Sequence, residues 1–199
     1  MQVDVDDVDF SIPRPFPGND DTEYLVTRNF AYFARLVRCV SVLNSVYARI
    51  KKKKDWGLDP ELVQLNPTLN SWLTELPSDL AVTFPADNSP PWLSSAFIGN
   101  LHSYHYLVYL ILHRPQLAFC DPNGTDGKWK HHMMTCYSSA RALCRLQEAI
   151  LKTFGLNGLS SMQRGFSFHV YCALSCIVLH LVRIPAADFR WNAKILTFI

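Results

Sequence analysis

Hydrophobic residues along most of this chain recur every three or four positions, the spacing that places them on one face of an α-helix. Between residues 21 and 52 such a stripe follows the acidic segment 20–23, whose charges are favourable at a helix N-terminus. The stripe is about two and a half heptads long, which favours a helix in a bundle core over a coiled-coil seam. Its members are Phe33, Leu36, Val37, Val40, Leu43, Val46, Tyr47 and Ile50.

A second helix is predicted from Asp59-Pro60 to Leu76-Pro77, because an acidic residue followed by proline is typical of a helix N-terminus. We expect Pro67 to kink or split this helix. Its apolar face consists of Leu62, Leu65, Leu69, Trp72, Leu73 and Leu76. A connection rich in proline follows, and loops of that length are commonly functional or lie against the protein surface. Residues 94–113 are apolar on nearly all sides, which predicts a helix with most of its surface buried.

Two more helices are predicted after the turn-forming residues 121–127. The first carries an apolar stripe from Met133 to Phe154, and we expect Gly155 and Gly158 to end it. The second runs from 166 to 182. The predicted fold is therefore all-α, an irregular multi-helix bundle with long proline-rich connections: an extended entry loop at 1–20, a helical domain at 21–184 and a C-terminal tail at 185–199.

The apolar segment 166–182 also raises the alternative of a membrane-associated helical protein. It falls short of a comfortable spanning length and contains His169 and His180. It also lacks the flanking aromatic belt and the charge asymmetry that orient a spanning helix. A helix inside the bundle is the preferred interpretation, with no membrane partner.

The composition indicates a protein that meets other proteins rather than DNA. Of the 199 residues 49% are hydrophobic and only 18% are charged, which leaves apolar surface for a protein partner or self-association. The net charge of +2 is too balanced for a dedicated nucleic-acid module. The four lysines Lys51, Lys52, Lys53 and Lys54 follow the first helix, where cations offset its negative end. The alternative is a nuclear-localisation patch.

No arrangement of residues predicts an enzyme, a catalytic residue or a cofactor. The chain has neither a phosphate-binding glycine loop nor a G-x-S-x-G motif. The six cysteines, at 39, 120, 136, 144, 172 and 176, are interpreted as free core thiols. His169, Cys172, Cys176 and His180 share one helix, but the outer two are about 16 Å apart, too far for one metal. His102 and His105 are likewise interpreted as core histidines, and no metal ligand is assigned. A metal-binding enzyme stays open as an alternative.

Two segments carry a family resemblance. Residues 65–80 (LNPTLNSWLTELPSDL) and 101–117 (LHSYHYLVYLILHRPQL) resemble the middle homology region of fungal binuclear zinc-cluster regulators, also called the fungal-specific or xylanolytic-activator regulatory domain. Weaker similarity covers 12–21 and 168–181. The residues that match the family motifs are Trp72, Leu76, Pro77, His113, Arg114 and Pro115.

The resemblance implies a non-enzymatic regulatory and interaction domain of a nuclear transcription factor, involved in control of DNA-templated transcription and open to a small-molecule effector. The family's DNA-binding zinc cluster begins C-x-x-C, which does not occur here. DNA contact and zinc are therefore expected only from a cluster outside this chain, and the chain is expected to represent the rear part of a truncated domain. We place a ligand pocket near Trp92, Phe97 and Tyr104, where aromatic and polar groups converge.

Overall fold

The computed structural model describes residue 11 and residues 21–50, 59–161 and 165–182. These residues form five α-helices and one short 3-10 helix, with no strand among them, so the all-α prediction is confirmed. The chain divides into two compact units, Met1–Pro77 and Ser78–Ile199, a division that the predicted single helical domain at 21–184 did not include. The lysines at 51–54, the tail at 185–199 and the entry loop at 1–20 apart from Ser11 lie outside the described residues.

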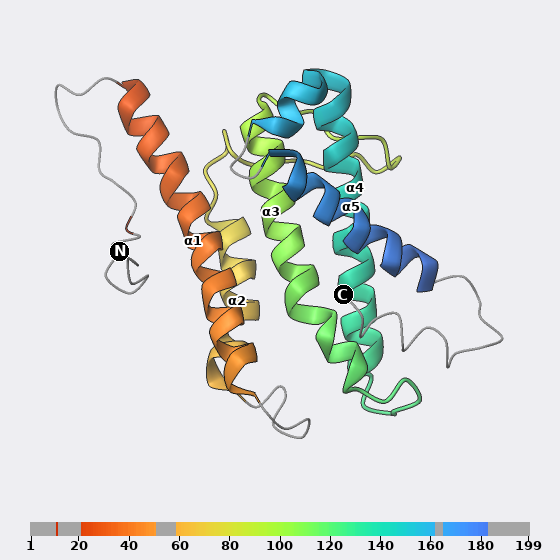
Figure 1. Ribbon diagram of the computed structural model, residues 1–199. Helices are drawn as coiled ribbons and strands as arrows, with labels where there is room; N and C mark the ends of the chain where they lie inside the picture. Colours follow the sequence, from red (N-terminus) through yellow and green to blue (C-terminus); the bar gives the residue numbers. More distant parts are fainter. Residues whose placement is uncertain (1–10, 12–20, 51–58, 162–164, 183–199) are drawn as a thin grey trace. The chain divides into compact units, whose positions relative to one another are not determined.

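The first unit contains α1 (Asp21–Arg49) and α2 (Pro60–Thr74), which run side by side (Figure 1). Three members of the predicted stripe on α1, Leu36, Leu43 and Val46, are fully buried. Val37, also predicted on that stripe, is instead 40% exposed. The buried face passes through Cys39 rather than Val37, because residues 36, 39, 43 and 46 keep the spacing of one helix face.

The helix α2 begins where the sequence predicts. The Asp59 carboxylate accepts hydrogen bonds from the backbone N–H groups of Glu61 and Leu62 and thereby caps the helix N-terminus. Of the two outcomes predicted for Pro67, a kink or a split, the split does not occur, because α2 continues through this residue. Proline has no N–H, so Pro67 leaves the carbonyl of Val63, four residues earlier, without its helical donor. Both residues lie on the exposed side of the helix. Water can therefore bind that carbonyl at little cost.

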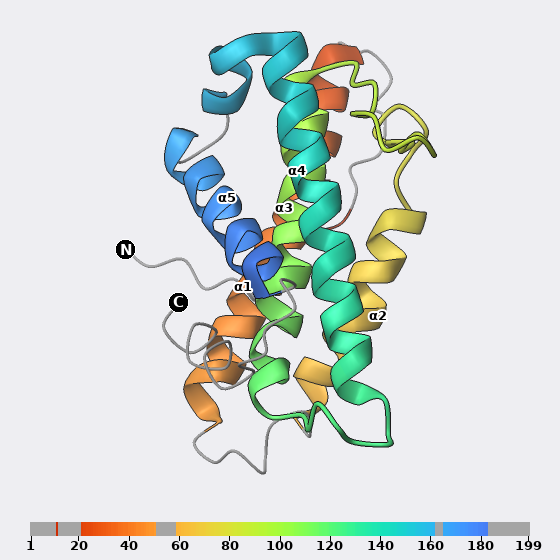
Figure 2. The same ribbon diagram turned by 90° about the vertical axis from the view of Figure 1, so that its right-hand side faces the viewer.

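The second unit contains α3 (Ala96–His113), the 3-10 helix η3 (Pro115–Ala118), α4 (Lys128–Ser160) and α5 (Gly165–Val182). The helices α3 and α4 lie side by side, and α5 crosses in front of them (Figures 1 and 2). Most residues of α3 are buried, as its apolar sequence predicts. The core between the three helices and η3 consists of Leu107, Leu110, Leu117, Cys136, Ala140, Leu143, Phe168, Cys172, Cys176 and Leu179.

Gly99 determines how closely α3 and α4 approach each other. A Cβ atom on Gly99 of α3 would lie 2.6 Å from Cγ1 of Ile150 on α4, so only glycine allows this close approach. Gly155 interrupts α4 with φ 64° and ψ −160°, as predicted. Gly158 does not end the helix, which resumes beyond Gly155 and reaches Ser160, because the Asn100 side chain donates to the Gly158 carbonyl at 3.0 Å and holds this turn against α3.

The proline-rich segment 78–95 has no helix and lies against the second unit. Leu80 and Leu93 are buried, and Leu80 offers its carbonyl oxygen to Nε2 of His102 at 2.8 Å. Arg145 of α4 donates to the carbonyls of Pro85 and Ser89 at distances between 2.6 and 3.0 Å. The segment is therefore held at several points, as expected for a long loop packed on a surface.

Candidate functional site

The family-motif residues of α2 serve packing in the first unit. Trp72 is buried, and its indole N–H donates to the backbone carbonyl of Tyr32 at 2.9 Å. The Tyr32 hydroxyl in turn donates to the backbone carbonyl of Glu75, just after the last residue of α2, at 3.1 Å. Leu76 and Pro77 are half-buried just beyond the helix end. Trp72 and the Glu75 carbonyl therefore fix the end of α2 against α1 through two hydrogen bonds with Tyr32.

A cavity of about 730 Å³ lies along the same two helices. Arg35 and Arg38 line it from α1, and Gln64 and Thr68 line it from α2. The Arg35 guanidinium forms an ion pair with Glu75 at 3.5 Å. The cavity thus offers charged and hydroxyl groups beside the apolar atoms of Leu65, Trp72, Cys39 and Val42. A cavity of this size and mixed lining fits a small polar molecule.

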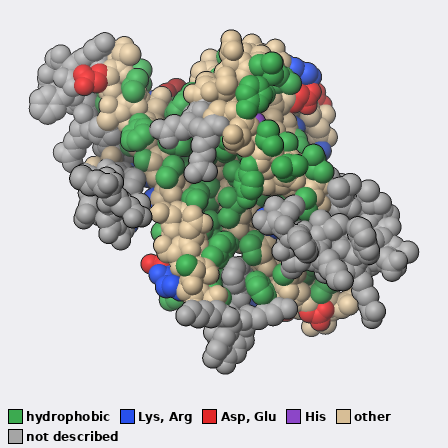
Figure 3. All heavy atoms as spheres, in the orientation of Figure 1, with side chains coloured by type: hydrophobic (Ala, Val, Ile, Leu, Met, Phe, Trp, Pro, Cys, Tyr) green, Lys and Arg blue, Asp and Glu red, His purple; other side chains and the backbone are tan. Residues whose placement is uncertain are grey.

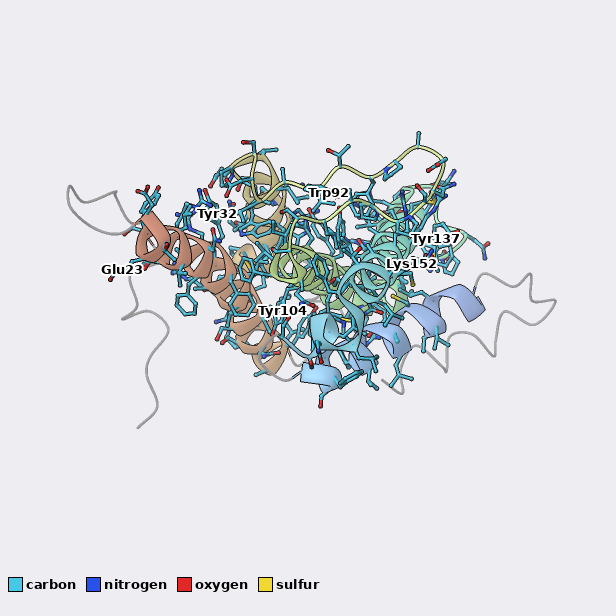
Figure 4. All side chains as sticks on the ribbon, turned by 90° about the horizontal axis from the view of Figure 1, so that it is seen from above. Glu23, Tyr32, Trp92, Tyr104, Tyr137 and Lys152 are labelled. Carbon is cyan, nitrogen blue, oxygen red and sulfur yellow. The ribbon has the colours of Figure 1, made fainter. Side chains whose placement is uncertain are left out.

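The predicted ligand pocket is not assembled by the structure. Trp92 is 81% exposed, whereas the ring of Tyr104 stacks on Phe168 of α5 with centroids 4.8 Å apart. Phe97 is half-buried. Trp92 and Tyr104 lie on opposite sides of α3 (Figure 4). The three residues therefore do not converge, because the register of α3 turns Tyr104 toward α5 and away from the loop that carries Trp92.

The His-Arg-Pro motif ends α3, as predicted. The backbone N–H of Arg114 still donates to Leu110 at 2.9 Å, and η3 begins at Pro115. His113, the last residue of α3, is buried. The chain then turns through residues 121–127, and α4 begins at the same end of the unit at which α3 ends (Figure 1).

This antiparallel arrangement brings together three histidines that the sequence analysis did not connect. His131 and His132 occupy the start of α4 and face His113. Nδ1 of His113 lies 2.8 Å from Nδ1 of His132, and one ring nitrogen from each of the three residues lies within 4.8 Å of the others. His113 is buried, His132 is half-buried and His131 is exposed, so the group opens to solvent on one side. We call these three residues the histidine triad.

Two members of the triad, His113 and His132, favour the neutral form of the imidazole ring. Burial, followed by the charges of His132 and His131, lowers the pKa of His113 to about 4. Burial is also the main cause of the lowered pKa of His132, with a smaller effect of His131. Neutral imidazole keeps a lone pair on one ring nitrogen, which is the form that binds transition metals. The sequence contained one signal for this site: the His131-His132 dipeptide follows the turn residues 121–127, and the helix before that turn ends in His113.

The other histidines and cysteines mostly fill the core. His102, His105 and His169 are buried, as predicted, while the side chain of His180 lies outside the described residues. Cys39, Cys136, Cys172 and Cys176 are buried, and burial raises the pKa of Cys136 and of Cys172 to about 12. Two cysteines depart from the prediction: Cys120 is half-buried and Cys144 is exposed. Cys144 follows the buried Leu143 by one residue, and a step of about 100° around the helix turns it to solvent.

The helix α5 has a second apolar face that faces solvent. Its inner face, with Phe168 and Cys172, belongs to the core of the second unit. Its outer face carries Phe166, Val170, Leu174 and Ile177, each between 47% and 53% exposed. We call these four residues the outer stripe of α5. Hydrophobic side chains gather on the face of the second unit over which α5 runs (Figure 3). Within the described residues no helix is both long enough and apolar enough to cross a membrane.

Comparison of the chain with protein-family models, with curated proteins and with solved structures found no match in any of the three.

Proposed function

We propose that this chain is a regulatory and interaction module of the fungal zinc-cluster transcription factor type, which acts in the nucleus by binding another protein through the outer stripe of α5. It contributes no catalytic residue. The motifs at 65–80 and 101–117 support the family, and the apolar outer stripe supports the interaction.

The proposed interaction rests on the observation that α5 is apolar on two faces, the one packed in the core and the one exposed to solvent. A helix that lies on the surface of a domain normally pairs one apolar face with one polar face. The residues of the outer stripe follow one another at spacings of three and four, so they form one continuous ridge rather than isolated exposed side chains. A ridge of this kind is typical of a surface that a partner covers.

The cavity between α1 and α2 is the place we propose for a small-molecule effector. Its arginines and hydroxyl groups would orient a polar ligand, and its position beside Trp72 links it to a family-motif residue. Binding there would stabilise the packing of α1 on α2, since a ligand that binds only the folded unit adds to its stability.

A tethering experiment tests the transcriptional role. The chain is fused to an unrelated DNA-binding domain in a yeast reporter strain, and expression is compared with that domain alone. We expect the fusion to change reporter expression and the double variant Val170→Glu/Leu174→Glu to abolish that change. Val63→Glu is the matched control, because Val63 is an exposed apolar residue of α2 outside the stripe.

Circular dichroism of the purified variants establishes that each retains its helices. Reporter expression that stays at the level of the DNA-binding domain alone would contradict the proposed role in transcription. An effect that persists in the double variant would contradict the outer stripe as the interaction surface.

A further inference from the structure

We propose that the histidine triad, His113, His131 and His132, is a binding site for a divalent transition-metal ion of the Zn²⁺ type, with three imidazole ligands and a fourth position open to solvent. This inference is independent of the proposed role in transcription and of any zinc cluster outside the chain. It rests on how the end of α3 and the start of α4 place three ligand atoms around one point.

The spacing of the ring nitrogens fits one ion. Zn²⁺ binds histidine nitrogen at 2.0–2.1 Å, so two nitrogens of a tetrahedral site lie about 3.3 Å apart. Nδ1 of His113 and Nδ1 of His132 are 2.8 Å apart, and they need to separate by only about half an ångström. One ring nitrogen from each of the three residues lies within 4.8 Å of the others, so His131 has to move closer for all three to reach the spacing of a tetrahedral site. A side-chain rotation can supply that movement, because His131 is exposed.

The pair of Nδ1 atoms has a chemical consequence. Two nitrogens 2.8 Å apart must have one proton between them, so one ring is the Nδ1–H tautomer and donates to the other. A metal ion that binds both Nδ1 atoms would replace this hydrogen bond, and it would lie to one side of the line between the two nitrogens. The proton would move to Nε2 of the same ring, and both Nδ1 lone pairs would then face the metal. The site therefore exchanges one hydrogen bond for two metal–nitrogen bonds without a change in net protonation.

Packing orients the buried ligand in advance. The ring of His113 stacks on Tyr109 with centroids 5.7 Å apart and an interplanar angle of 10°. Tyr109 in turn contacts the ring of His105 one helical turn earlier, with centroids 5.0 Å apart. Rings held in this way lose little freedom when they bind an ion, which increases affinity.

The surrounding charges select the kind of metal. The charged side chains next to the triad in the sequence, Arg114 and Lys130, are basic, and Asp126 is already paired with Lys128 at 3.2 Å. The triad offers no carboxylate, the ligand type that Mg²⁺ and Ca²⁺ require. Only an ion with a strong preference for imidazole nitrogen overcomes this basic environment, which favours Zn²⁺, Cu²⁺ or Ni²⁺.

The test is a titration of the full chain, freed of metal by a chelator and kept reduced, with Zn²⁺ followed by isothermal calorimetry. We expect one ion per chain at micromolar affinity or tighter, and a rise in the melting temperature on binding. His131→Ala and His132→Ala should each weaken binding by more than the roughly 10–100-fold that loss of an outer partner of a metal ligand costs. Both sites lie on a helix where alanine is well tolerated, so the variants should stay folded.

Lys130→Ala is the matched control, because it alters an exposed residue beside the triad and removes a positive charge. It should leave the affinity unchanged or increase it. Titration with Co²⁺ identifies the ligand type, since thiolate ligands add strong charge-transfer bands that imidazole ligands do not. The proposal is overturned if the wild-type chain binds no Zn²⁺, if binding survives in both alanine variants, or if Co²⁺ shows thiolate bands.

Discussion

Arg145 holds the proline-rich segment 78–95 against α4, and replacing it measures how much that attachment stabilises the second unit. Its guanidinium donates to the Ser89 carbonyl through Nε at 3.0 Å and through Nη2 at 2.6 Å, and to the Pro85 carbonyl at 2.8 Å. It also lies over the Phe84 ring, 5.0 Å from its centre. The fork of donors thus joins two carbonyls and an aromatic ring of one loop.

The expected loss follows from these contacts. A hydrogen bond from a charged donor contributes about 1.5–3 kcal/mol. Pro85 and Ser89 are only half-buried, so water can reach their carbonyls and the loss falls toward the lower end. A stacked cation adds about 0.5–1 kcal/mol at a partly exposed ring. Because water replaces the lost donors at both carbonyls, we count the three hydrogen bonds together as about one such bond, and for Arg145→Ala we expect the free energy of unfolding of the second unit to fall by about 2–3 kcal/mol.

The assay is native-state hydrogen exchange read by mass spectrometry, because peptides from α3 and α4 report on the second unit alone. Limited proteolysis measures the loop itself, and we expect faster cleavage within residues 81–92. Arg145→Lys is the control. Its single ammonium group keeps the charge but cannot bridge both carbonyls, so its loss should be intermediate. If Arg145→Ala leaves α3 protection within about 0.5 kcal/mol of wild type and cleavage unchanged, the attachment is not stabilising.

Three further predictions follow from single contacts. Gly99→Ala should destabilise the second unit by about 1–3 kcal/mol in urea unfolding, because its Cβ would overlap the fully buried Ile150; a stabilised variant would contradict this packing. Burial lowers the pKa of His102, so the unfolded protein binds more protons at this residue and the free energy of unfolding falls as the pH drops below about 6.5. His102→Gln should make the free energy of unfolding less dependent on pH in this range, and an unchanged slope against pH would refute the prediction. Trp72→Phe should cost about 1–3 kcal/mol, because it removes the indole N–H that donates to the Tyr32 carbonyl and part of a buried ring; chemical denaturation measures this loss, and an unchanged midpoint would count against the role of that hydrogen bond.

The sequence determined the helices of this protein because their signals are local. Apolar spacing predicted the helices. Asp59 marked the start of α2 because its side chain caps the helix, and Gly155 marked the interruption of α4 because it adopts a positive φ. Arg114-Pro115 marked the end of α3 because proline lacks a backbone donor. At Pro67 the same local reasoning left a kink and a split both open, and the helix is not split. A proline inside a helix costs less where the freed carbonyl can bind water, and the exposure of that carbonyl is a property of the folded protein.

Only the tertiary structure decided which residues meet. Trp92 and Tyr104 are close enough in sequence to suggest one pocket, but the register of α3 places them on opposite sides. His113 and His132 are separated by a turn cluster, yet they meet because α3 and α4 run antiparallel, so that α4 begins at the end of the second unit where α3 ends. Helix periodicity fixes the direction of a side chain relative to its own helix axis. The rotation of one helix against the next depends on packing, such as the close approach at Gly99, which the spacing of residues in one helix does not specify.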